Sequence, residues 1–472
     1  MNSAVRNLIL ACFSVAIAFT FASCKSSSGP GLEESVRIAT DAYIYGYPLV
    51  TMDMTRKRLT NVAVADAEHA PMGQILKLRT YPSVDNHAVT APNADTLYTT
   101  AWFDVSREPW ILSVPDMGDR YFLLPMLSGW TDVFQVPGKR TGASKAATYA
   151  ITGPGWSGKL PDGVTEYKSP TGMVWLLGRI YCTGTPEDYK AVHELQDKFQ
   201  LVPLSSYGKA YTPTQGDVDN NLDMKTAVRD QVDSMSIEEY FTYLARLLKD
   251  NPPAAADAPI ISDMAKIGIV PGKDFDPSIL RSLDKELIKG VPKAAQLKII
   301  EHLKDAGKPI NGWMFTTQAG VYGTDYLQRA LVTAIGLGAN RPQDAVYPTG
   351  EKDSKGDKFD ADGHNYVMHI DKGQMPPVNA FWSLTMYDSA YFFVPNSLNR
   401  YTVSSRSKFA TNPDGSVDIY IQAQSPGGSK VANWLPAPKG KFVPMLRLYW
   451  PKETPPSIID GSWNPPGISP TK

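Results

Sequence analysis

The feature that most constrains the fold of this chain is a pair of strand-rich regions on either side of a helical middle third. Between residues 72 and 184, and again after residue 341, short β-branched and aromatic runs are separated by turns of proline, glycine and aspartate. Regularly spaced short strands with such turns are typical of antiparallel β-sandwiches. Because 472 residues exceed what one core usually covers, we expect two or three domains.

The strand-rich regions have clear strand candidates. In the first region they are Leu97–Val105, Trp110–Val114, Tyr121–Met126 and Met173–Tyr181. In the second region, apolar and polar residues alternate over 382–387 and over 417–422, and 442–450 is the last strong candidate. Alternation of this kind indicates strands with one buried face. We therefore predict a sandwich in each region.

Helices are expected before and between these regions. Apolar residues recur every three or four positions from Glu33, which indicates a helix that Pro48 should kink or restart. Thr185 with Asp188, and Ser236 with Glu239, have the spacing of capping boxes at helix starts. Further helices are predicted over 254–267, 277–289, 293–306 and 324–338. The expected organisation is 33–184, 185–340 and 341–472, the middle part being mainly helical.

The first residues have the form of a sorting signal. Arg6 precedes an apolar run of 14 residues, Leu8 to Phe21, which is shorter than the roughly 20 residues that span a bilayer. The run ends in Phe21-Ala22-Ser23-Cys24, which resembles the lipobox of bacterial lipoproteins. We expect residues 1–23 to be removed, Cys24 to be acylated, and residues 24–32 to form a flexible tether. The alternative is an ordinary secretory peptide.

This signal predicts the location of the protein in the cell and leaves one cysteine thiol in the mature chain. The expected location is the bacterial cell envelope, with the protein anchored by lipid on its periplasmic or outer-membrane face. Of the three cysteines, Cys12 leaves with the signal and Cys24 carries the lipid, so only Cys182 remains. Since one thiol makes no intramolecular disulfide, core burial must hold the fold.

Charge excludes one large class of partners. Lys and Arg number 47 against 48 Asp and Glu, which gives a formal net charge of −1. Nucleic-acid binding depends on a basic excess that neutralises phosphates. We therefore expect the partners to be the membrane, through Cys24, and a small molecule, with no nucleic acid.

Several long motifs resemble one family. Residues 42–48 (AYIYGYP) and 92–98 (PNADTLY) are similar to the domain of unknown function 1254. Residues 379–388 (NAFWSLTMYD), 433–438 (NWLPAP) and 447–451 (RLYWP) are similar to its companion, the domain of unknown function 1214. The resemblance implies an α+β fold in which an immunoglobulin-like sandwich and a jelly-roll-like sandwich flank a helical region. It implies no activity, cofactor or catalytic residue.

Motifs with known chemistry are absent from the sequence or weak in it. No G-x-S-x-G nucleophile elbow occurs, and four scattered S-x-x-K matches are what chance produces. His193 and Asp197 share one helix face without a third ligand, and the turn at 360–363 lacks the outer ligands of a calcium loop. His364 and His369 fall on opposite faces of a strand. We predict no metal site, and the cofactor is left open.

Polar residues within aromatic sequence are the remaining candidates for chemistry. Asn93 and Asp95 precede a strand that carries Tyr98, so Asp95 can serve as a general base and Asn93 as a donor to an oxyanion. The alternative is that both hold a turn through bonds to the backbone. Arg447, in a β-rich run, must be paired or must face a cavity, where it binds an anionic ligand or an internal partner such as Asp95.

Three aromatic residues are candidates for ligand contact. Trp382, Tyr387 and Trp434, like Tyr98, can stack on sugar rings, although aromatic residues at strand spacing are more often core.

Three functions follow from the candidate residues of this sequence. The first is a hydrolase or lyase for a small polar or anionic substrate, with its pocket where the two sandwiches meet. The second is a non-catalytic binding protein for a carbohydrate or another envelope ligand, and the third is a structural envelope module.

Overall fold

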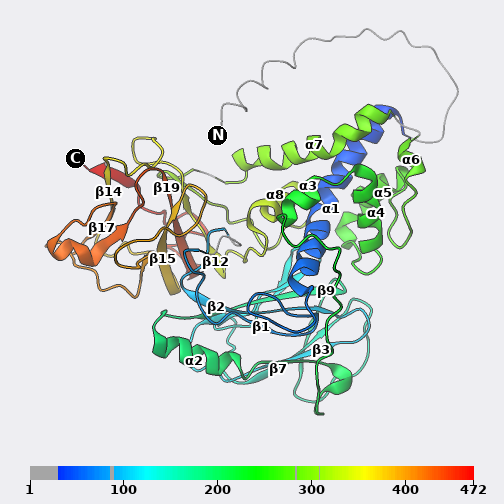
Figure 1. Ribbon diagram of the computed structural model, residues 1–472, viewed down its shortest axis with the longest axis horizontal. Coiled ribbons are helices and arrows are strands. Elements are labelled where there is room, and N and C mark those ends of the chain that lie inside the picture. The colour runs from blue at the N-terminus through cyan, green and yellow to red at the C-terminus, as the bar shows by residue number, and fades with distance from the viewer. Residues whose placement is uncertain (1–29, 86–89, 282–283, 308, 472) are drawn as a thin grey trace, which may run out of the picture.

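A computed structural model describes residues 30–85, 90–281, 284–307 and 309–471. The predicted signal, Cys24 and most of the tether lie outside these residues. Two separate β-structures flank a group of helices, as Figure 1 shows, and this arrangement confirms the α+β class. No helix within the described ranges combines the length and the hydropathy that crossing a bilayer requires.

The N-terminal sandwich consists of two sheets with an apolar core between them. The larger sheet has the order β1-β2-β9-β5-β6, with β4 paired to β9, and the smaller has the order β10-β3-β7-β8. The bounds are β1 Leu76–Lys77, β2 Thr96–Asp104, β3 Trp110–Val114, β4 Phe122–Leu123, β5 Met126–Ser128, β6 Val133–Gln135, β7 Ala147–Thr152, β8 Thr165–Lys168, β9 Met173–Tyr181 and β10 Gln200–Pro203. Within it, β7 and β8 run parallel, unlike the antiparallel pairs that we expected throughout.

The strand predictions in this region were accurate except at one place. The predicted strand over 121–126 is two short strands, β4 and β5, because Pro125 separates them and donates no ladder hydrogen bond. Cys182 is a buried free thiol in the sandwich core. Burial of apolar surface, without a disulfide from this cysteine, therefore holds the sandwich together.

The helical part is organised around one long helix. α1 (Leu32–Thr60) packs against five others, which are α3 (Val228–Asp233), α4 (Ile237–Leu247), α5 (Ala258–Lys266), α7 (Lys285–Glu301) and α8 (Tyr326–Gly336). α2 (Pro186–Gln196) lies apart from this group, beside the N-terminal sandwich (Figure 1). α6 (Ser278–Arg281) is a single turn, and short 3-10 turns η1 Leu204–Ser206, η2 Ala255–Asp257, η3 His302–Lys304 and η4 Gly428–Asn433 complete the set.

Two prolines do not interrupt their helices. α1 continues through Pro48, so the predicted restart there was wrong, and α7 continues through Pro292, where we expected two helices. An interior proline costs about 3 kcal/mol in an exposed helix. Both prolines are buried, and the packing of their helix faces against the core compensates for the lost hydrogen bond.

The two predicted caps behave differently. Ser236 Oγ accepts from Glu239 N (3.2 Å) and Glu239 Oε2 accepts from Ser236 N (2.9 Å), which confirms the first capping box. Thr185 Oγ1 caps α2 by accepting from Asp188 N (3.2 Å). The carboxylate of Asp188, however, accepts from Thr183 N (2.6 Å) and pairs with Arg120. The second box is therefore only half formed.

The C-terminal sandwich also has two sheets. The larger has the order β11-β13-β19-β15-β16, with β12 paired to β19, and the smaller has the order β18-β17-β14-β20. The bounds are β11 Trp313–Met314, β12 Ala345–Val346, β13 Thr349–Gly350, β14 Asn365–Ile370, β15 Val378–Asp388, β16 Thr402–Ser404, β17 Val417–Gln422, β18 Trp434–Pro436, β19 Phe442–Pro451 and β20 Ile468–Thr471. β17 alternates between buried and half-buried residues as predicted.

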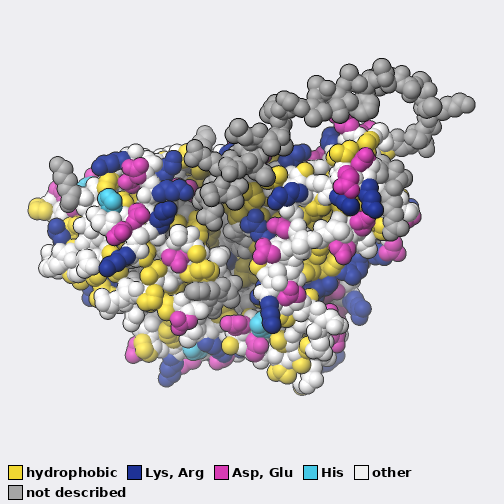
Figure 2. Space-filling view, turned by 45° about the horizontal axis from the view of Figure 1, so that its top comes forward, with side chains coloured by type: hydrophobic (Ala, Val, Ile, Leu, Met, Phe, Trp, Pro, Cys, Tyr) yellow, Lys and Arg dark blue, Asp and Glu magenta, His cyan; other side chains and the backbone are white. Residues whose placement is uncertain are grey.

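β15 departs from the predicted alternation. Residues 381–387 are all buried, although the sequence pattern indicated one buried and one exposed face. One face packs in the sandwich core, and the other lies against the N-terminal part of the protein, where Ser383 bonds Asp95. The two sandwiches therefore meet through the larger C-terminal sheet. On the outer face drawn in Figure 2, acidic and basic side chains are interspersed.

Candidate functional site

The loop before β2 carries two of the predicted site residues. Asn93 Oδ1 accepts from Asp95 N (2.6 Å) and Thr96 N (3.2 Å), which is the turn-holding geometry of an Asx residue. Its Nδ2 donates to Thr96 Oγ1 and to Tyr449 OH of β19, both at 3.0 Å. Asn93 thus bonds across to the C-terminal sandwich.

Asp95 is fully buried and its two oxygens are both bonded. Ser383 Oγ donates to Oδ2 (2.6 Å) and Arg406 Nη1 donates to Oδ1 (2.9 Å). Arg406 also donates to Ala94 O (3.0 Å). The cation that pairs with Asp95 is therefore Arg406. The sequence did not single out Arg406, because it lies in a polar turn after β16 where the neighbouring residues form no recognisable motif.

Arg447 bonds other groups at the same interface. Its Nη1 donates to Thr385 Oγ1 (2.8 Å), and its Nη2 donates to Tyr387 OH (2.5 Å) and Ala91 O (2.9 Å). Tyr387 OH donates to Pro92 O (2.7 Å). The suggested bond from Arg447 to Asp95 is not among these contacts. Protein groups satisfy this buried guanidinium, and it joins the loop before β2 to the C-terminal sheet.

Tyr98 lies beside a second buried arginine. The guanidinium carbon of Arg179 is 5.2 Å from the Tyr98 ring, and Arg179 also bonds Asn340 Oδ1 (3.0 Å) and Gly338 O (3.2 Å). Burial raises the pKa of the Tyr98 phenol, but the positive charge and hydrogen bond of Arg179, together with Asn93 and Arg447, outweigh it, so the pKa of Tyr98 is below its usual range.

The two predicted tryptophans are core residues. Trp382 stacks on Phe409 with ring centroids 5.9 Å apart, and Trp434 Nε1 donates to Gln422 O (2.9 Å). Both side chains are buried. Neither presents a ring face to solvent in this structure, so sugar stacking there needs a rearrangement.

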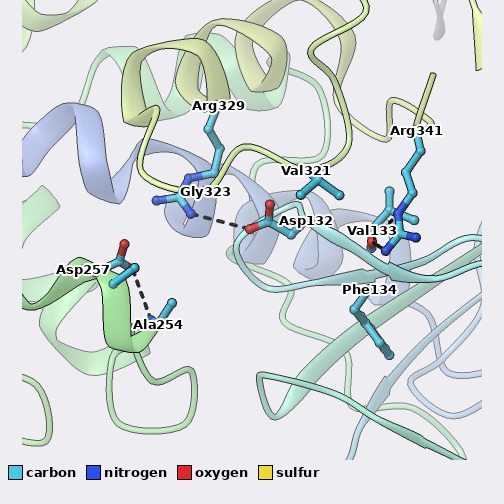
Figure 3. A pocket seen from close by; sticks show the side chains of 10 residues that line it. Asp132, Val133, Phe134, Ala254, Asp257, Val321, Gly323, Arg329 and Arg341 are labelled. Carbon is cyan, nitrogen blue, oxygen red and sulfur yellow. Dashed lines mark hydrogen bonds and ion pairs between the residues drawn. The ribbon is translucent and has the colours of Figure 1, made fainter. Parts of the chain in front are cut away.

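A pair of adjoining cavities opens where the edge of the N-terminal sandwich meets the helices, and Figure 3 shows the first of them. Their volumes are about 270 Å³ and 580 Å³, and both are lined by Val321 and Arg341. We call the pair the junction pocket. All three parts of the chain contribute to its wall, which includes Asp132 before β6, Asp257 of η2, Arg329 of α8 and Glu453 after β19. The junction pocket is a different place from the pocket that we expected between the two sandwiches.

Arg329 is the unusual residue of the junction pocket. Its side chain descends from α8 towards Asp132 in Figure 3, and it is only 3% exposed. Nη1 lies 3.6 Å from Asp132 Oδ2. Nε and Nη2 are buried and have no hydrogen-bond partner among the described residues. The guanidinium carbon is 5.5, 5.2 and 5.3 Å from the ring centroids of Tyr45, Trp130 and Tyr326.

Two carboxylates of the pocket differ in their surroundings. Asp257 accepts from Tyr45 OH (3.0 Å), Tyr326 OH (2.9 Å) and Ala254 N (3.1 Å), so its oxygens are fully bonded. Asp132 accepts from Tyr322 N (3.1 Å) and is held near Arg329. Burial raises the pKa of Asp132 above its usual range, although Arg329 opposes the rise.

Two arginines line the second cavity. Arg140 forms a bidentate pair with Asp344, with Nε–Oδ1 at 2.7 Å and Nη2–Oδ2 at 3.2 Å. Arg341 donates through Nε to Val133 O (2.8 Å) and has no carboxylate within 4 Å in the described part of the chain. Burial lowers the pKa of Arg341, the carboxylate of Asp344 opposes this effect, and the neighbouring Arg140 adds to it. A negative group in this cavity would therefore be favourable.

The weak metal candidates are held by protein contacts. His193 Nε2 lies 2.6 Å from Arg79 O, and Asp197 pairs with Arg79 and Lys77. His369 Nδ1 lies 2.6 Å from Asp418 Oδ1. Within the described ranges, no group of three or more potential ligands is placed to hold a metal ion.

Comparison with known proteins identifies two family matches within the chain and similar solved structures. Residues 72–203 match the protein of unknown function DUF1254, and residues 344–453 match the protein of unknown function DUF1214. The crystal structure of VPA0106 from Vibrio parahaemolyticus is similar over 93% of this chain and all of its own, with 26% identity and a TM-score of 0.70.

Two further comparisons give no information about function. An uncharacterized protein from Burkholderia cenocepacia aligns over 93% of both chains at 12% identity, with a TM-score of 0.41 that does not imply a shared fold. A search of curated proteins found no match. The similarity to VPA0106 supports the arrangement of two sandwiches and helices, and it names no ligand.

Proposed function

We propose that this chain, which belongs to the DUF1254 and DUF1214 family, binds a small organic anion in the junction pocket. One observation carries the proposal. Nε and Nη2 of Arg329, a buried guanidinium that lines the pocket, have no hydrogen-bond partner among the described residues. Leaving buried donors unpaired costs roughly 1–3 kcal/mol, and more when they are charged, so a function that uses them is expected.

The geometry of those two atoms favours a carboxylate. Nε and Nη2 lie on one edge of the planar guanidinium, and that edge presents two parallel N–H groups to a carboxylate or phosphate. The protein uses the same edge of Arg140 to hold the carboxylate of Asp344. A ligand carboxylate on Arg329 would repeat this bidentate contact once the side chains that cover Nε and Nη2 have moved, because both atoms are buried in this structure.

The charge of the pocket supports the same ligand. Asp132 is the nearest carboxylate to Arg329, at 3.6 Å, and hydroxyl and amide donors occupy the oxygens of Asp257. Arg341, which separates the two cavities, has no carboxylate within 4 Å in the described residues. An anion with a second polar or charged group, long enough to reach Arg341 from Arg329, would therefore fit.

A structural role for Arg329 is the competing explanation. Three aromatic rings lie within 5.5 Å of its guanidinium carbon, and such contacts contribute about 0.5–2 kcal/mol each. In that case the ring faces take the place of hydrogen-bond acceptors. The two explanations differ in what happens to ligand affinity when Arg329 is replaced.

The test is a screen of small mono- and dicarboxylates and phosphate esters by thermal shift, followed by calorimetry on the acids that raise the Tm. Arg329→Gln should weaken binding at least about tenfold, or about 1.4 kcal/mol. Arg246→Gln, which removes an exposed arginine stacked on Tyr243, is the matched control and should bind as the wild type does.

A second variant covers the case in which Arg329→Gln does not fold. Val321 is exposed and lines both cavities, so Val321→Trp should fill the pocket and abolish binding without a loss of stability. The proposal fails if no acid in the screen raises the Tm. It also fails if an acid does so but binds both variants with unchanged affinity.

Catalysis by a hydrolase or lyase is a second candidate, and Asp132 favours it. A carboxyl group whose pKa burial raises, next to an arginine in a pocket, has the properties of a general acid or base. Asp132→Asn should then abolish turnover of a bound acid while leaving its affinity within about threefold. If no bound acid is turned over by the wild type, the protein only binds.

We also propose that the mature chain is held in the bacterial cell envelope by lipid on Cys24. The support is the apolar run 8–21 followed by Ala22-Ser23-Cys24. A lipid anchor would place the junction pocket near a membrane, on the side where small envelope metabolites arrive.

A further inference from the structure

α7 and the short turn η3 present an apolar surface to solvent. Twelve large hydrophobic side chains are exposed among the described residues, and four of them lie here, which is more than chance placement would give. They are Leu287 (50%), Leu297 (52%), Ile300 (38%) and Leu303 (41%). Leu297 and Ile300 point away from the buried side of α7, and Leu287 and Leu303 lie at the two edges of the exposed side. The opposite face of α7 is buried against the other helices. We call these four residues, with the lysines described next, the α7 face.

Lysines accompany these apolar residues. Lys289, Lys293, Lys298 and Lys304 are exposed along the same stretch, where Glu301 is the only acidic residue between Leu287 and Lys304. Lys289 pairs with Glu286 just before this stretch, with Nζ–Oε1 at 3.2 Å. An exposed helix face that combines leucine and isoleucine with lysine is typical of helices that lie in the interface of a membrane. The lysine charges would favour anionic lipid headgroups.

The chain that precedes the described residues ends close to this face. Seven residues separate Cys24 from Leu32, the first residue of α1, so the eight steps between the two Cα atoms span at most about 28 Å when extended. α1 packs against α7, and Gln296 Nε2 of α7 donates to Tyr43 OH of α1 (3.2 Å). In Figure 1 the beginning of α1 lies beside the N-terminal end of α7, the end nearer α6, at the outer edge of the helical part.

We propose that the α7 face lies on the anionic phospholipid surface of the membrane that carries the Cys24 lipid. The short tether holds this edge of the protein near the bilayer, the lysines contact phosphate groups, and the leucine and isoleucine side chains enter the boundary between headgroups and acyl chains. A second copy of the chain is a poorer occupant, because a symmetric contact would bring the same four lysines together.

The test tethers the mature chain, residues 24–472 with Cys24→Ser, to vesicles of phosphatidylethanolamine and phosphatidylglycerol. An N-terminal histidine tag on a nickel-chelating lipid replaces the natural anchor, so the result does not depend on acylation. An environment-sensitive fluorophore is placed on Leu297→Cys. The control position is Val64→Cys, which is more exposed than Leu297 (65% against 52%) but follows the far end of α1, about 43 Å from its start. Cys182 is buried and stays unlabelled.

The label at residue 297 should shift its emission to the blue on vesicles and lose at least about half its intensity when doxyl lipids are included. The label at residue 64 should change little. Leu297→Glu combined with Ile300→Glu should abolish the quenching of a label at Leu303→Cys, and circular dichroism will show that this variant folds.

Two results would overturn the proposal. One is equal quenching, or none, at residues 297 and 64. The other is a blue shift at residue 297 that appears without vesicles and grows with protein concentration, because a second copy would then cover the α7 face. Loss of the effect in vesicles without phosphatidylglycerol would support the role of the lysines.

Discussion

Arg406 Nη1 lies 2.9 Å from Asp95 Oδ1, and this ion pair joins two residues that are 311 positions apart in the chain. Asp95 precedes the first long strand of the N-terminal sandwich, whereas Arg406 follows β16 of the C-terminal sandwich. Ser383 of β15 holds the other carboxylate oxygen at 2.6 Å. A carboxylate that the sequence suggested as a general base is thus also a structural link between the sandwiches.

Asp95→Ala should destabilise the protein by about 3 kcal/mol, because it leaves the guanidinium of Arg406 without its partner. The value is at the low end for a buried pair, since Arg406 is 24% exposed and water can solvate part of it. Urea denaturation of the variant measures the loss. Arg406→Met in the same background should restore part of it, and purely additive losses in the double variant would show that the pair is not coupled.

Acid should destabilise the protein in part through Asp188. Burial raises the pKa of Asp188, but hydrogen bonds from Arg120 and Thr183 outweigh it and bring the pKa to about 2. Because the folded pKa is below the unfolded value of about 3.9, the stabilisation is present above pH 4 and is lost as the pH falls towards 2.

The stabilisation from Asp188 amounts to about 2 kcal/mol, since the side chains of Asp188 and Arg120 are mostly buried. Asp188→Asn should therefore flatten the dependence of unfolding free energy on pH between about 4 and 2. Denaturant titrations at several pH values measure the slope. A variant with the wild-type slope would show that other carboxylates cause the acid sensitivity.

Ser236→Ala should lower stability by about 1 kcal/mol, because the N–H of Glu239 loses its capping acceptor at the start of α4. Ser236→Gly is the matched comparison at the same position, and it should cost only a few tenths of a kcal/mol. Chemical denaturation of both variants gives the difference. Equal losses would mean that the capping box is not what stabilises this helix end.

The lipid on Cys24 is open to direct measurement. Mass spectrometry of the mature N-terminus should find a diacylglyceryl group on Cys24 and no residues from the signal. Globomycin, which inhibits the peptidase that cuts before the lipidated cysteine, should cause a larger precursor to accumulate. A mature chain that begins elsewhere, or an unmodified Cys24, would contradict the anchor and leave an ordinary secretory peptide as the explanation.

Local patterns were sufficient to predict many elements. β3 and β9 match their predicted bounds, and the Ser236 box starts α4 as expected, since such signals depend on residues within a few positions of one another. Pro48 and Pro292 misled the prediction. A proline inside a helix costs free energy locally, because it removes a backbone hydrogen bond. Here that cost is outweighed by the burial of the helix faces against elements that lie far away in the sequence.

The candidate site residues were also predicted only where a local sequence pattern marked them. The sequence selected Asn93, Asp95 and Arg447, and the structure brings all three to the interface between the sandwiches. It did not select Arg329 or Asp132, which form the junction pocket. The only available signal was a lone arginine within the apolar run of α8, and such a residue is often exposed or paired.

By itself, the sequence determined the order of strand-rich and helical regions, the limits of strands such as β3 and β9, the Ser236 capping box and the predicted lipid signal, because each depends on residues that are close along the chain. Only the tertiary structure decided which cation meets Asp95, which guanidinium nitrogens of Arg329 lack a hydrogen-bond partner among the described residues, and which helix face is exposed. Those outcomes depend on burial and on contacts between residues hundreds of positions apart, for which a single sequence carries no local pattern.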